Sequence, residues 1–219
     1  MRVQTIITPS ISALRPSDTV EHALGLLMEY SIRHLPVVDE DERLVGVVSE
    51  DQLMEAASSE DRIERFIRPS PVSVHVDEHL FDAARIMVKH GLTTLPVTRG
   101  EGQYEGLIKR YDIFDRFAQM LATQRRGAIL ALEVDPRDYA LAKLIHAIEQ
   151  NDAKVRAVAS EPVDEDSDTI RVTLKLNVTD TSRIRHVLEH HGYRIVASFG
   201  EEDEEILERA EEFMRFLEV

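Results

Sequence analysis

The chain contains no cysteine and no tryptophan, and only nine of its 219 residues are glycine. Without cysteine the protein can form no disulfide and no thiolate metal site, and it has no cysteine nucleophile. The few glycines form no Gly-x-Ser-x-Gly elbow, no phosphate-binding Gly-Lys-Ser/Thr loop and no dinucleotide fingerprint. We therefore expect a protein that is not an enzyme and that has no catalytic residues and no cofactor.

Long apolar runs are also missing. No run approaches the ~20 residues that a helix needs to cross a bilayer. The N-terminus, Met1 to Thr5, lacks the apolar stretch of a secretory signal. A composition of 43% hydrophobic and 31% charged residues is typical of a soluble globular protein. These features predict a cytoplasmic protein with no membrane partner.

Positive charge is scarce, because 26 Lys and Arg residues face 41 Asp and Glu residues, for a net charge of -15. Nucleic-acid binding depends on clustered Lys and Arg, and the sequence contains no such cluster, so we expect no nucleic-acid partner. His186 and His190 have the i, i+4 spacing of a metal-binding pair, but no third ligand is evident in the sequence. We therefore predict no metal site.

The dominant feature of the sequence is an internal repeat with a period of 60 residues. Residues 34–39 and 44–53 of the first copy recur as residues 94–97 and 104–113 of the second, so that Pro36 and Gly46 correspond to Pro96 and Gly106. Each copy reads as two short buried strands joined by a charged turn and followed by a helix. Duplicated units usually bury their apolar faces together, so two copies predict a closed pseudo-symmetric pair.

A further helix precedes the strands in each copy. The apolar positions of the first copy are Val20, Ala23, Leu24, Leu27 and Met28, which correspond to Leu80, Ala83, Ala84, Met87 and Val88 of the second. This spacing of i, i+3, i+4, i+7 and i+8 predicts one buried face of an amphipathic helix.

The pattern changes after residue 127. We expect strands at 128–134, 155–159, 170–176 and 194–199, with one helix after the first strand and another from residue 181. This βαββαβ order is that of a ferredoxin-like unit. The whole chain is therefore predicted to belong to the mixed α/β (α+β) class.

The last segment, residues 201–219, carries nine Asp or Glu residues and two Arg residues. It is predicted to form an acidic amphipathic C-terminal helix whose apolar side consists of Ile206, Leu207, Ala210, Phe213, Met214 and Leu217. Either this side packs on its own domain, or it forms a dimer contact, since residues 206, 210, 213 and 217 have a/d spacing.

The repeated His-Leu-Pro-Val-Val-Asp and Gly-Val-Val-Ser blocks make residues 3–123 resemble a tandem CBS-domain pair, also called a Bateman module. Residues 127–199 resemble an ACT domain in the order of their elements. The combination is similar to the CBS–ACT proteins of the acetoin-utilisation type. The resemblance implies CBS units at 3–64 and 65–124, an ACT-like domain at 127–200 and the C-terminal helix at 201–219.

The resemblance implies a regulatory protein that binds an adenine nucleotide (AMP, ADP or ATP) in the cleft between the CBS units. The family motif is Gly-hydrophobic-hydrophobic-Thr/Ser-x-x-Asp. The first copy has Gly46 and Ser49 but Gln52 in place of Asp, whereas the second has Gly106 and Asp112 but Lys109 in place of Thr or Ser. A carboxylate can accept hydrogen bonds from both ribose hydroxyls, so Asp112 is the better anchor. A lysine in place of a hydroxyl favours nucleotides over nucleosides.

By resemblance, the pocket centred on Asp112 draws its residues from both copies. They are Lys109, Tyr111, Leu107, Ile32, Arg33, Thr93 and Thr94. A weaker, pseudo-symmetric pocket would contain Val47, Ser49 and Gln52. In an alternative interpretation Asp112 serves only as a helix cap, since Asp is a preferred capping residue.

Two other functions stay open. Because each copy keeps only half of the motif, the protein can instead be a dimeric structural scaffold that binds no nucleotide. The ACT-like domain can also sense an amino acid or another small carboxylate, although its loop at 135–139 has no glycine to let a ligand approach the backbone. By resemblance to CBS pairs, which commonly associate face to face, we expect a homodimer. The regulated partner protein is unknown.

Overall fold

The computed structural model describes residues 1–200 except residues 9–10, 68–70, 138 and 165–167, so the predicted C-terminal helix lies outside the described residues. The chain divides into two compact units, Met1–Arg116 and Phe117–Val219. None of the helices in the described part of the chain is long and apolar enough to span a membrane.

The first copy of the repeat forms a helix, a hairpin and a second helix. These are α1 (Val20–Tyr30), β1 (His34–Val38), β2 (Leu44–Ser49) and α2 (Glu50–Met54). The Thr19 side chain accepts the N–H of His22 and caps α1, as a threonine before an apolar helix predicts. β1 and β2 pair antiparallel with His34 opposite Ser49, which confirms the predicted hairpin.

The second copy repeats this arrangement. It contains α3 (Leu80–His90), β4 (Thr94–Arg99), β5 (Gln103–Lys109) and α4 (Arg110–Met120). A short strand, β3 (Val74–His75), pairs parallel with β4 and was not predicted, because two residues show no alternation that a sequence pattern could reveal. At the equivalent place in the first copy, Leu14 forms a single parallel bridge with Val37.

The segments that precede the two copies are exchanged between them. The turn η1 (Val3–Thr5) packs on the second copy, where the N–H of Val3 donates to the carbonyl of Glu78 at 3.0 Å. The equivalent turn η2 (Ile63–Arg65) packs on the first copy, where the N–H of Ile63 donates to the carbonyl of Asp18 at 2.9 Å. Val3 and Ile63 are both fully buried. Each copy therefore completes the core of the other.

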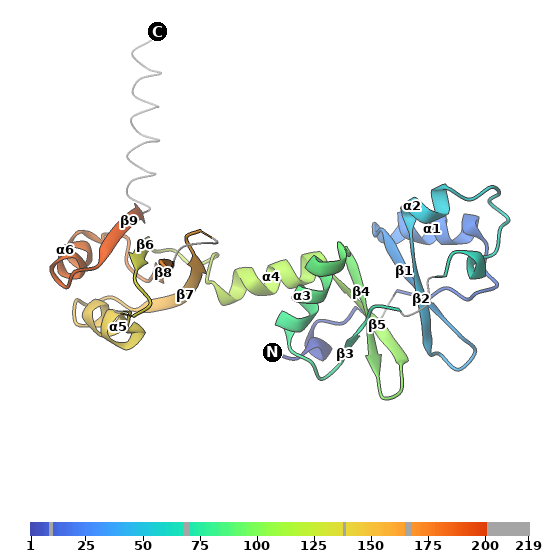
Figure 1. The fold of residues 1–219 in the computed structure, drawn as a ribbon, viewed down its shortest axis with the longest axis horizontal. Helices are drawn as coiled ribbons and strands as arrows, with labels where there is room; N and C mark the ends of the chain where they lie inside the picture. Colours follow the sequence, from blue (N-terminus) through green and yellow to red (C-terminus); the bar gives the residue numbers. More distant parts are fainter. Residues whose placement is uncertain (9–10, 68–70, 138, 165–167, 201–219) are drawn as a thin grey trace, which may run out of the picture. The chain divides into compact units, whose positions relative to one another are not determined.

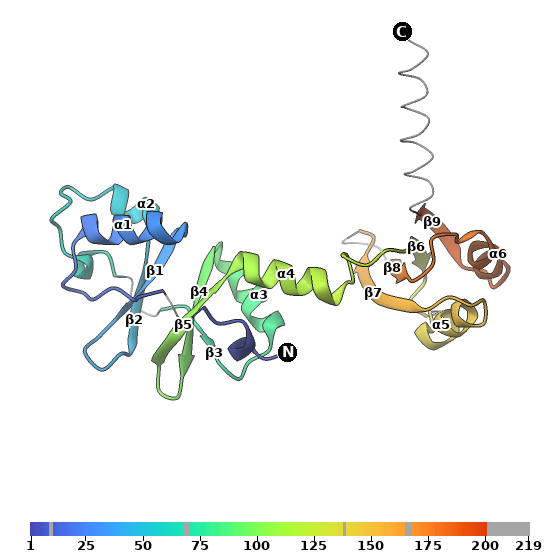
Figure 2. The ribbon, with the colours of Figure 1, turned by 180° about the vertical axis from the view of Figure 1, so that it is seen from behind.

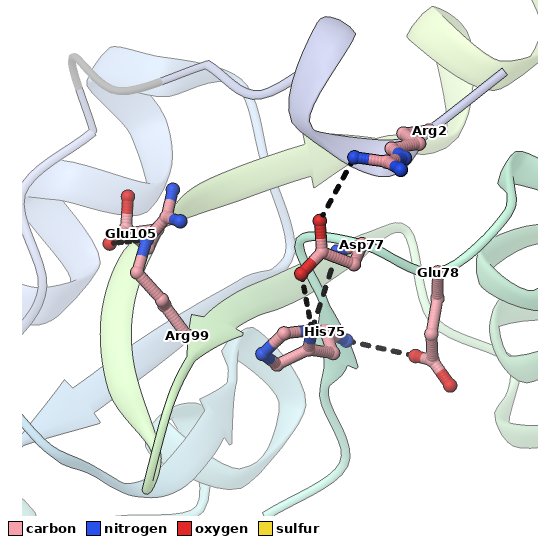
Figure 3. Close-up of polar contacts among 6 residues, drawn as sticks. All are labelled: Arg2, His75, Asp77, Glu78, Arg99 and Glu105. Carbon is pink, nitrogen blue, oxygen red and sulfur yellow. Dashed lines mark hydrogen bonds and ion pairs between the residues drawn. The ribbon is translucent and has the colours of Figure 1, made fainter.

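Ion pairs on the surface accompany the exchange of η1. Arg2 Nη1 lies 3.4 Å from Asp77 Oδ1, and the other oxygen of Asp77 lies 3.7 Å from His75 Nδ1 (Figure 3). These groups are exposed, and exposed pairs contribute about 0–1 kcal/mol each. The stability of the exchange therefore comes from the buried apolar side chains and not from these charges.

The two hairpins also form a single antiparallel bridge with each other, between Arg43 and Gln103 at their turn ends. The N–H of Leu44 donates to the carbonyl of Gly102, and the N–H of Tyr104 donates to the carbonyl of Glu42, each at 2.9 Å. The side chain of Leu107, on β5 of the second copy, belongs to the apolar core of the first. The predicted pseudo-symmetric pair is thus a single packed body.

The second unit has the predicted ferredoxin-like order. Its elements are β6 (Ile129–Val134), α5 (Leu141–Glu149), β7 (Val155–Pro162), β8 (Ile170–Leu176), α6 (Ser182–His190) and β9 (Arg194–Phe199). The sheet order is β7-β8-β6-β9, and all three pairings are antiparallel. α5 and α6 lie side by side on one face of the sheet (Figures 1 and 2), where their apolar residues form the core.

One prediction about the helices is wrong. Met28 of α1 and Val88 of α3 were expected on the buried face, but they are 78% and 82% exposed. Position i+8 lies about 80° around a helix from position i, at the edge of the apolar stripe. The buried stripe of α1 is narrower and consists of Val20, Ala23 and Leu27.

Replacing Ile63 by alanine should test the exchanged packing. We expect Ile63→Ala to lower the free energy of unfolding by about 2–5 kcal/mol, because the side chain is fully buried against the first copy. Glu40→Ala, at an exposed position of the turn between β1 and β2, serves as the control and should change it by about 0.5 kcal/mol or less. Urea unfolding measures both, and equal midpoints would contradict the exchange.

Candidate functional site

The junction between β5 and α4 holds the two residues on which the predicted site is centred. Asp112 lies in the first turn of α4, and its Oδ2 accepts the backbone N–H of Lys109 at 3.1 Å. Asp112 therefore does bind the start of its helix, as the alternative interpretation expected. This bond occupies one of about four lone-pair positions of a carboxylate, so Asp112 keeps acceptor capacity for a ligand.

The equivalent junction of the first copy is closed on itself. Gln52 Oε1 accepts both the N–H and the hydroxyl of Ser49, at 3.0 and 3.1 Å, while Ser49 Oγ accepts the N–H of Gln52 at 3.3 Å. This capping box commits the hydroxyl and the amide oxygen to each other. Val47 lies on β2 opposite Pro36 and is half-buried.

Side chains of the second copy reach from the β5–α4 junction to the α1–β1 connection of the first copy. Thr94 lies opposite Lys109 across the hairpin, and its hydroxyl donates to the carbonyl of His34 at 2.9 Å. The Thr93 hydroxyl lies 3.0 Å from His34 Nδ1. The ammonium of Lys109 donates to the carbonyl of Tyr30, the last residue of α1, at 3.4 Å. Lys109, Thr93 and Thr94 thus meet the chain segment 30–34.

The other four predicted residues differ in how far their side chains are exposed to a ligand. Ile32 and Leu107 are 7% and 1% exposed and belong to the apolar core of the first copy. Tyr111 is 68% exposed on α4. The guanidinium of Arg33 is exposed and lies 3.5 Å from Glu50. Ile32 and Leu107 can therefore only form part of the apolar core beneath the site, whereas the side chains of Tyr111 and Arg33 are exposed and can contact a ligand directly.

Sequence reasoning missed two residues of this junction, His34 and Arg110. Arg110 donates from Nε to the carbonyl of Leu92 at 3.1 Å, and its backbone N–H donates to Thr93. The available signal was a charge contrast between the copies, since Lys109 and Arg110 occupy the positions that Ser49 and Glu50 fill in the first copy.

Burial and neighbouring charges set the protonation of His34. Burial lowers the pKa of His34 below its usual 6.5; Asp51 opposes this, whereas Arg110 and Arg33 lower the pKa further. The imidazole therefore favours its neutral form, and it lies among cationic side chains in a chain whose net charge is -15.

The second unit contains a cavity of about 510 Å³ between the β6–α5 loop and the turn before β9. It is lined by Glu133, Val134, Asp135, Tyr139, Lys143, His191, Gly192 and Tyr193. Burial raises the pKa of Tyr139, and the neighbouring Tyr193 raises it further. Glu133 is already paired with Arg171 and Arg194, at 3.2 and 3.1 Å. Asp135 and Tyr139 belong to the loop at which an ACT-like ligand was considered.

The profile of the CBS domain matches residues 3–59 and 63–119 of the chain. The chain belongs to the CBS domain family. The two matched segments contain both copies of the 60-residue repeat, so the exchanged pair described above is a CBS pair.

The curated relatives share this part of the chain. Inosine-5'-monophosphate dehydrogenase of Methanocaldococcus jannaschii is 24% identical over 146 residues, which is 66% of this chain and 29% of that protein. The magnesium transporter MgtE of Thermus thermophilus is 33% identical over 115 residues, which is 50% of this chain and 25% of that protein. The chain thus spans less than a third of the length of either relative.

Solved structures show the same fold. A CBS domain pair/ACT domain protein of Thermotoga maritima is 21% identical with a TM-score of 0.51, and the match covers 55% of this chain and 99% of that one. AcuB of Vibrio cholerae, which is assigned to acetoin utilization, is 27% identical with a TM-score of 0.50, over 57% of this chain and 95% of that one.

The depressed pKa of His34 predicts a pH-dependent stability. The unfolded chain accepts a proton below about pH 6.5 that the folded protein resists, so the free energy of unfolding should fall as the pH is lowered through about 6.5. His34→Thr, which places the residue of the second copy at this position, should flatten this dependence in thermal unfolding. His22→Asn, at an exposed position of α1, should leave it unchanged. Equal slopes for His34→Thr and the parent would contradict the assignment.

Proposed function

We propose that the CBS pair is a non-enzymatic regulatory module that binds an adenine nucleotide (AMP, ADP or ATP) at the β5–α4 junction. The observation that carries this proposal is that Lys109 and Thr93 contact segment 30–34 of the first copy, while Asp112 accepts the N–H of Lys109 at the same junction. Likeness to AcuB of Vibrio cholerae supports acetoin or other small-carbon metabolism as the context.

The chemistry of this junction suits a nucleotide. The carboxylate of Asp112 can accept hydrogen bonds from the two ribose hydroxyls, and such charge-assisted bonds are roughly twice as strong as neutral ones. Lys109 supplies a cation for the phosphate at the end of the same strand. The exposed ring of Tyr111 offers a surface on which a base can stack, an interaction worth about 1–3 kcal/mol per base.

One ligand per chain is favoured over two. In the first copy Ser49 and Gln52 satisfy each other, and Glu50 and Asp51 place two negative charges where the second copy has Arg110 and Tyr111. A phosphate approaching that junction would be repelled. The pocket around Val47, Ser49 and Gln52 is therefore the weaker of the two.

The nucleotide regulates only if it binds two arrangements of the protein with different affinity. The contacts of segment 30–34 with Thr93, Thr94 and Lys109 join the two CBS copies, so a ligand at this place is positioned to alter their relation. The regulated partner would read that change.

A second candidate function is sensing of an amino acid by the second unit. The observation that favours it is the cavity lined by Asp135, Tyr139 and Lys143, because a carboxylate and an ammonium in one cavity can meet the two charges of a zwitterion. The remaining alternative is a dimeric scaffold that binds neither ligand.

We further propose that the protein is a homodimer joined through the helices of the CBS pair. Apolar side chains are exposed at the same positions of both copies: Met28 and Val88 (78% and 82%), and Met54 and Phe114 (72% and 66%). Exposed apolar residues that repeat on pseudo-symmetric helices favour a common contact face.

Calorimetric titration of AMP, ADP and ATP into the protein tests the nucleotide proposal. We expect binding to the parent and at least tenfold weaker binding to Asp112→Asn, a loss of about 1.4 kcal/mol. The asparagine oxygen can still accept the N–H of Lys109, so the start of the helix is retained while the charge is lost.

Two matched variants control this titration. Gln52→Ala, at the pseudo-symmetric position, and Asp41→Asn, at an exposed turn, should each bind within about threefold of the parent, well under the ~1.4 kcal/mol of a tenfold change. If Asp112→Asn binds as the parent does, the site is not centred on Asp112. If no nucleotide produces heat or thermal stabilisation, the adenine proposal fails, and stabilisation by an amino acid would then favour the second candidate.

Introducing a charge on the helical face tests the dimer. The parent should have a mass in light scattering of roughly twice the 24.9 kDa of the chain, and Phe114→Glu should shift it toward the monomer, because a desolvated carboxylate is costly in an apolar contact. Phe199→Glu, on β9 of the second unit, is the control, because Phe199 is similarly exposed at 62%. Dissociation by Phe199→Glu alone would place the contact on the second unit.

A further inference from the structure

Lys109 is the side chain that distinguishes the two strand-to-helix junctions of the CBS pair. Its counterpart Ser49 forms a closed capping box within its own copy. Lys109 instead leaves its copy, and its ammonium donates to the carbonyl of Tyr30, at the C-terminus of α1 in the other copy. The side chain therefore links the two copies at the place where we propose that the nucleotide binds.

We propose that Lys109 is a phosphate-operated latch: it holds the end of α1 in the free protein and transfers to the phosphate when a 5'-phosphorylated nucleoside binds. This inference rests on the proposed function, which supplies the nucleotide, and it goes beyond that function by assigning both the specificity and the structural response to one residue.

The free-state contact is of a kind that a phosphate can replace. The last carbonyls of a helix carry partial negative charge, so a lysine ammonium is attracted to them, but the attraction is that of a partial charge. A phosphate carries a full negative charge or more, so the ammonium forms a stronger bond with it than with the partial charge of a carbonyl. A phosphate within reach of Lys109 therefore competes successfully with the carbonyl of Tyr30.

The surroundings of Lys109 favour an anion. The chain carries a net charge of -15, which repels phosphates at long range. At this junction, however, Lys109 lies opposite Thr94, whose hydroxyl is bonded to the carbonyl of His34, and Arg33 and Arg110 lie close enough to act on His34 against the opposing charge of Asp51. In the described part of the first copy, the equivalent positions carry Glu50 and no lysine.

Loss of the contact has a defined structural consequence. Tyr30 ends α1, and the next residue, Ser31, has a left-handed backbone with φ of 52°. The N–H of Ile32 donates back to the carbonyl of Leu27 at 3.0 Å, and the backbone N–H of Glu50 donates to the carbonyl of Arg33 at 2.9 Å. Segment 30–33 thus bonds to both the end of α1 and the start of α2, so we expect release of Tyr30 to loosen this segment.

The coupling must be reciprocal. If the phosphate draws Lys109 from Tyr30, then the contact with Tyr30 weakens phosphate binding by the same factor. Adenosine, which has no phosphate, should bind through Asp112 and leave the latch in place. Comparison of AMP with adenosine therefore distinguishes binding of the nucleoside from release of Lys109 by the phosphate.

The first test compares AMP with adenosine by calorimetry on the full chain. We expect the parent to bind AMP at least tenfold more tightly, a difference of about 1.4 kcal/mol. In Lys109→Ser, which carries the residue of the first copy, this ratio should fall below about threefold while adenosine affinity is retained. Lys154→Ser removes an exposed lysine of the second unit and should preserve the ratio of the parent.

The second test needs no ligand and measures hydrogen exchange of the amides of residues 30–33. In the free protein, Lys109→Ser should exchange faster there than the parent, and Lys109→Met, which keeps the length of the side chain, should do the same. Addition of AMP should speed exchange in the parent toward that of the variants, whereas adenosine should not. If Lys109→Ser exchanges faster throughout the CBS pair, that variant is globally destabilised. The exchange of residues 30–33 in Lys109→Met is then the measurement that tests the latch.

The outcomes separate this inference from the proposed function. If neither AMP nor adenosine binds, the nucleotide proposal fails, and the latch fails with it because no phosphate reaches Lys109. If both bind equally and Lys109→Ser leaves the ratio unchanged, the nucleotide site stands and the latch is overturned. Unchanged exchange at residues 30–33 in both free variants would also overturn it.

Discussion

The architecture of the CBS pair depends on the exchange of two buried turns. Val3 is inserted into the second copy and Ile63 into the first, so neither copy has a complete core without chain supplied from outside it. The cross-pairing of the two hairpins and the placement of Leu107 in the core of the first copy follow from this arrangement. The junction around Lys109 is rigidly placed against segment 30–34 because the two copies share one packed interior.

On this symmetric frame the chemistry is asymmetric. The backbone of both copies presents the same strand end and helix start, but the first junction is filled by a neutral capping box and two acidic residues. The second carries Lys109, Arg110 and Asp112, whose carboxylate has spare acceptor capacity. A duplicated scaffold can thus keep its packing while only one of its two equivalent positions retains groups suited to an anionic ligand, because packing depends on the buried apolar positions and recognition on a few exposed ones.

Much of the fold was predictable from the sequence because it repeats. The 60-residue period predicted both hairpins and their helices, and the βαββαβ order of the second unit followed from alternating apolar patterns. The exchange of η1 and η2 was not predictable, since a turn packed on its own copy and one packed on the other have the same sequence. Met28 and Val88 were assigned to the core because helical spacing alone does not reveal how wide the buried stripe is.

The candidate site was predictable only as far as its motif extends. Asp112 and Lys109 stand at motif positions. His34 was missed because its contacts with Thr93 and Thr94 join the two copies, and Arg110 was missed because its bonds to Leu92 and Thr93 depend on the folded chain and not on the motif. The roles of all the predicted site residues stay predictions until a ligand is titrated.

The exchanged turns also bear on how such a pair can arise. A single copy, made as a separate chain, would have its leading turn beside it and no partner to receive it. It would complete its core by trading turns with a second identical chain, as domain-swapped dimers do. Fusion of two copies makes the trade intramolecular, and the stability of the fold then no longer depends on protein concentration. The smallest part of this chain that has a complete core is accordingly the pair and not the single copy.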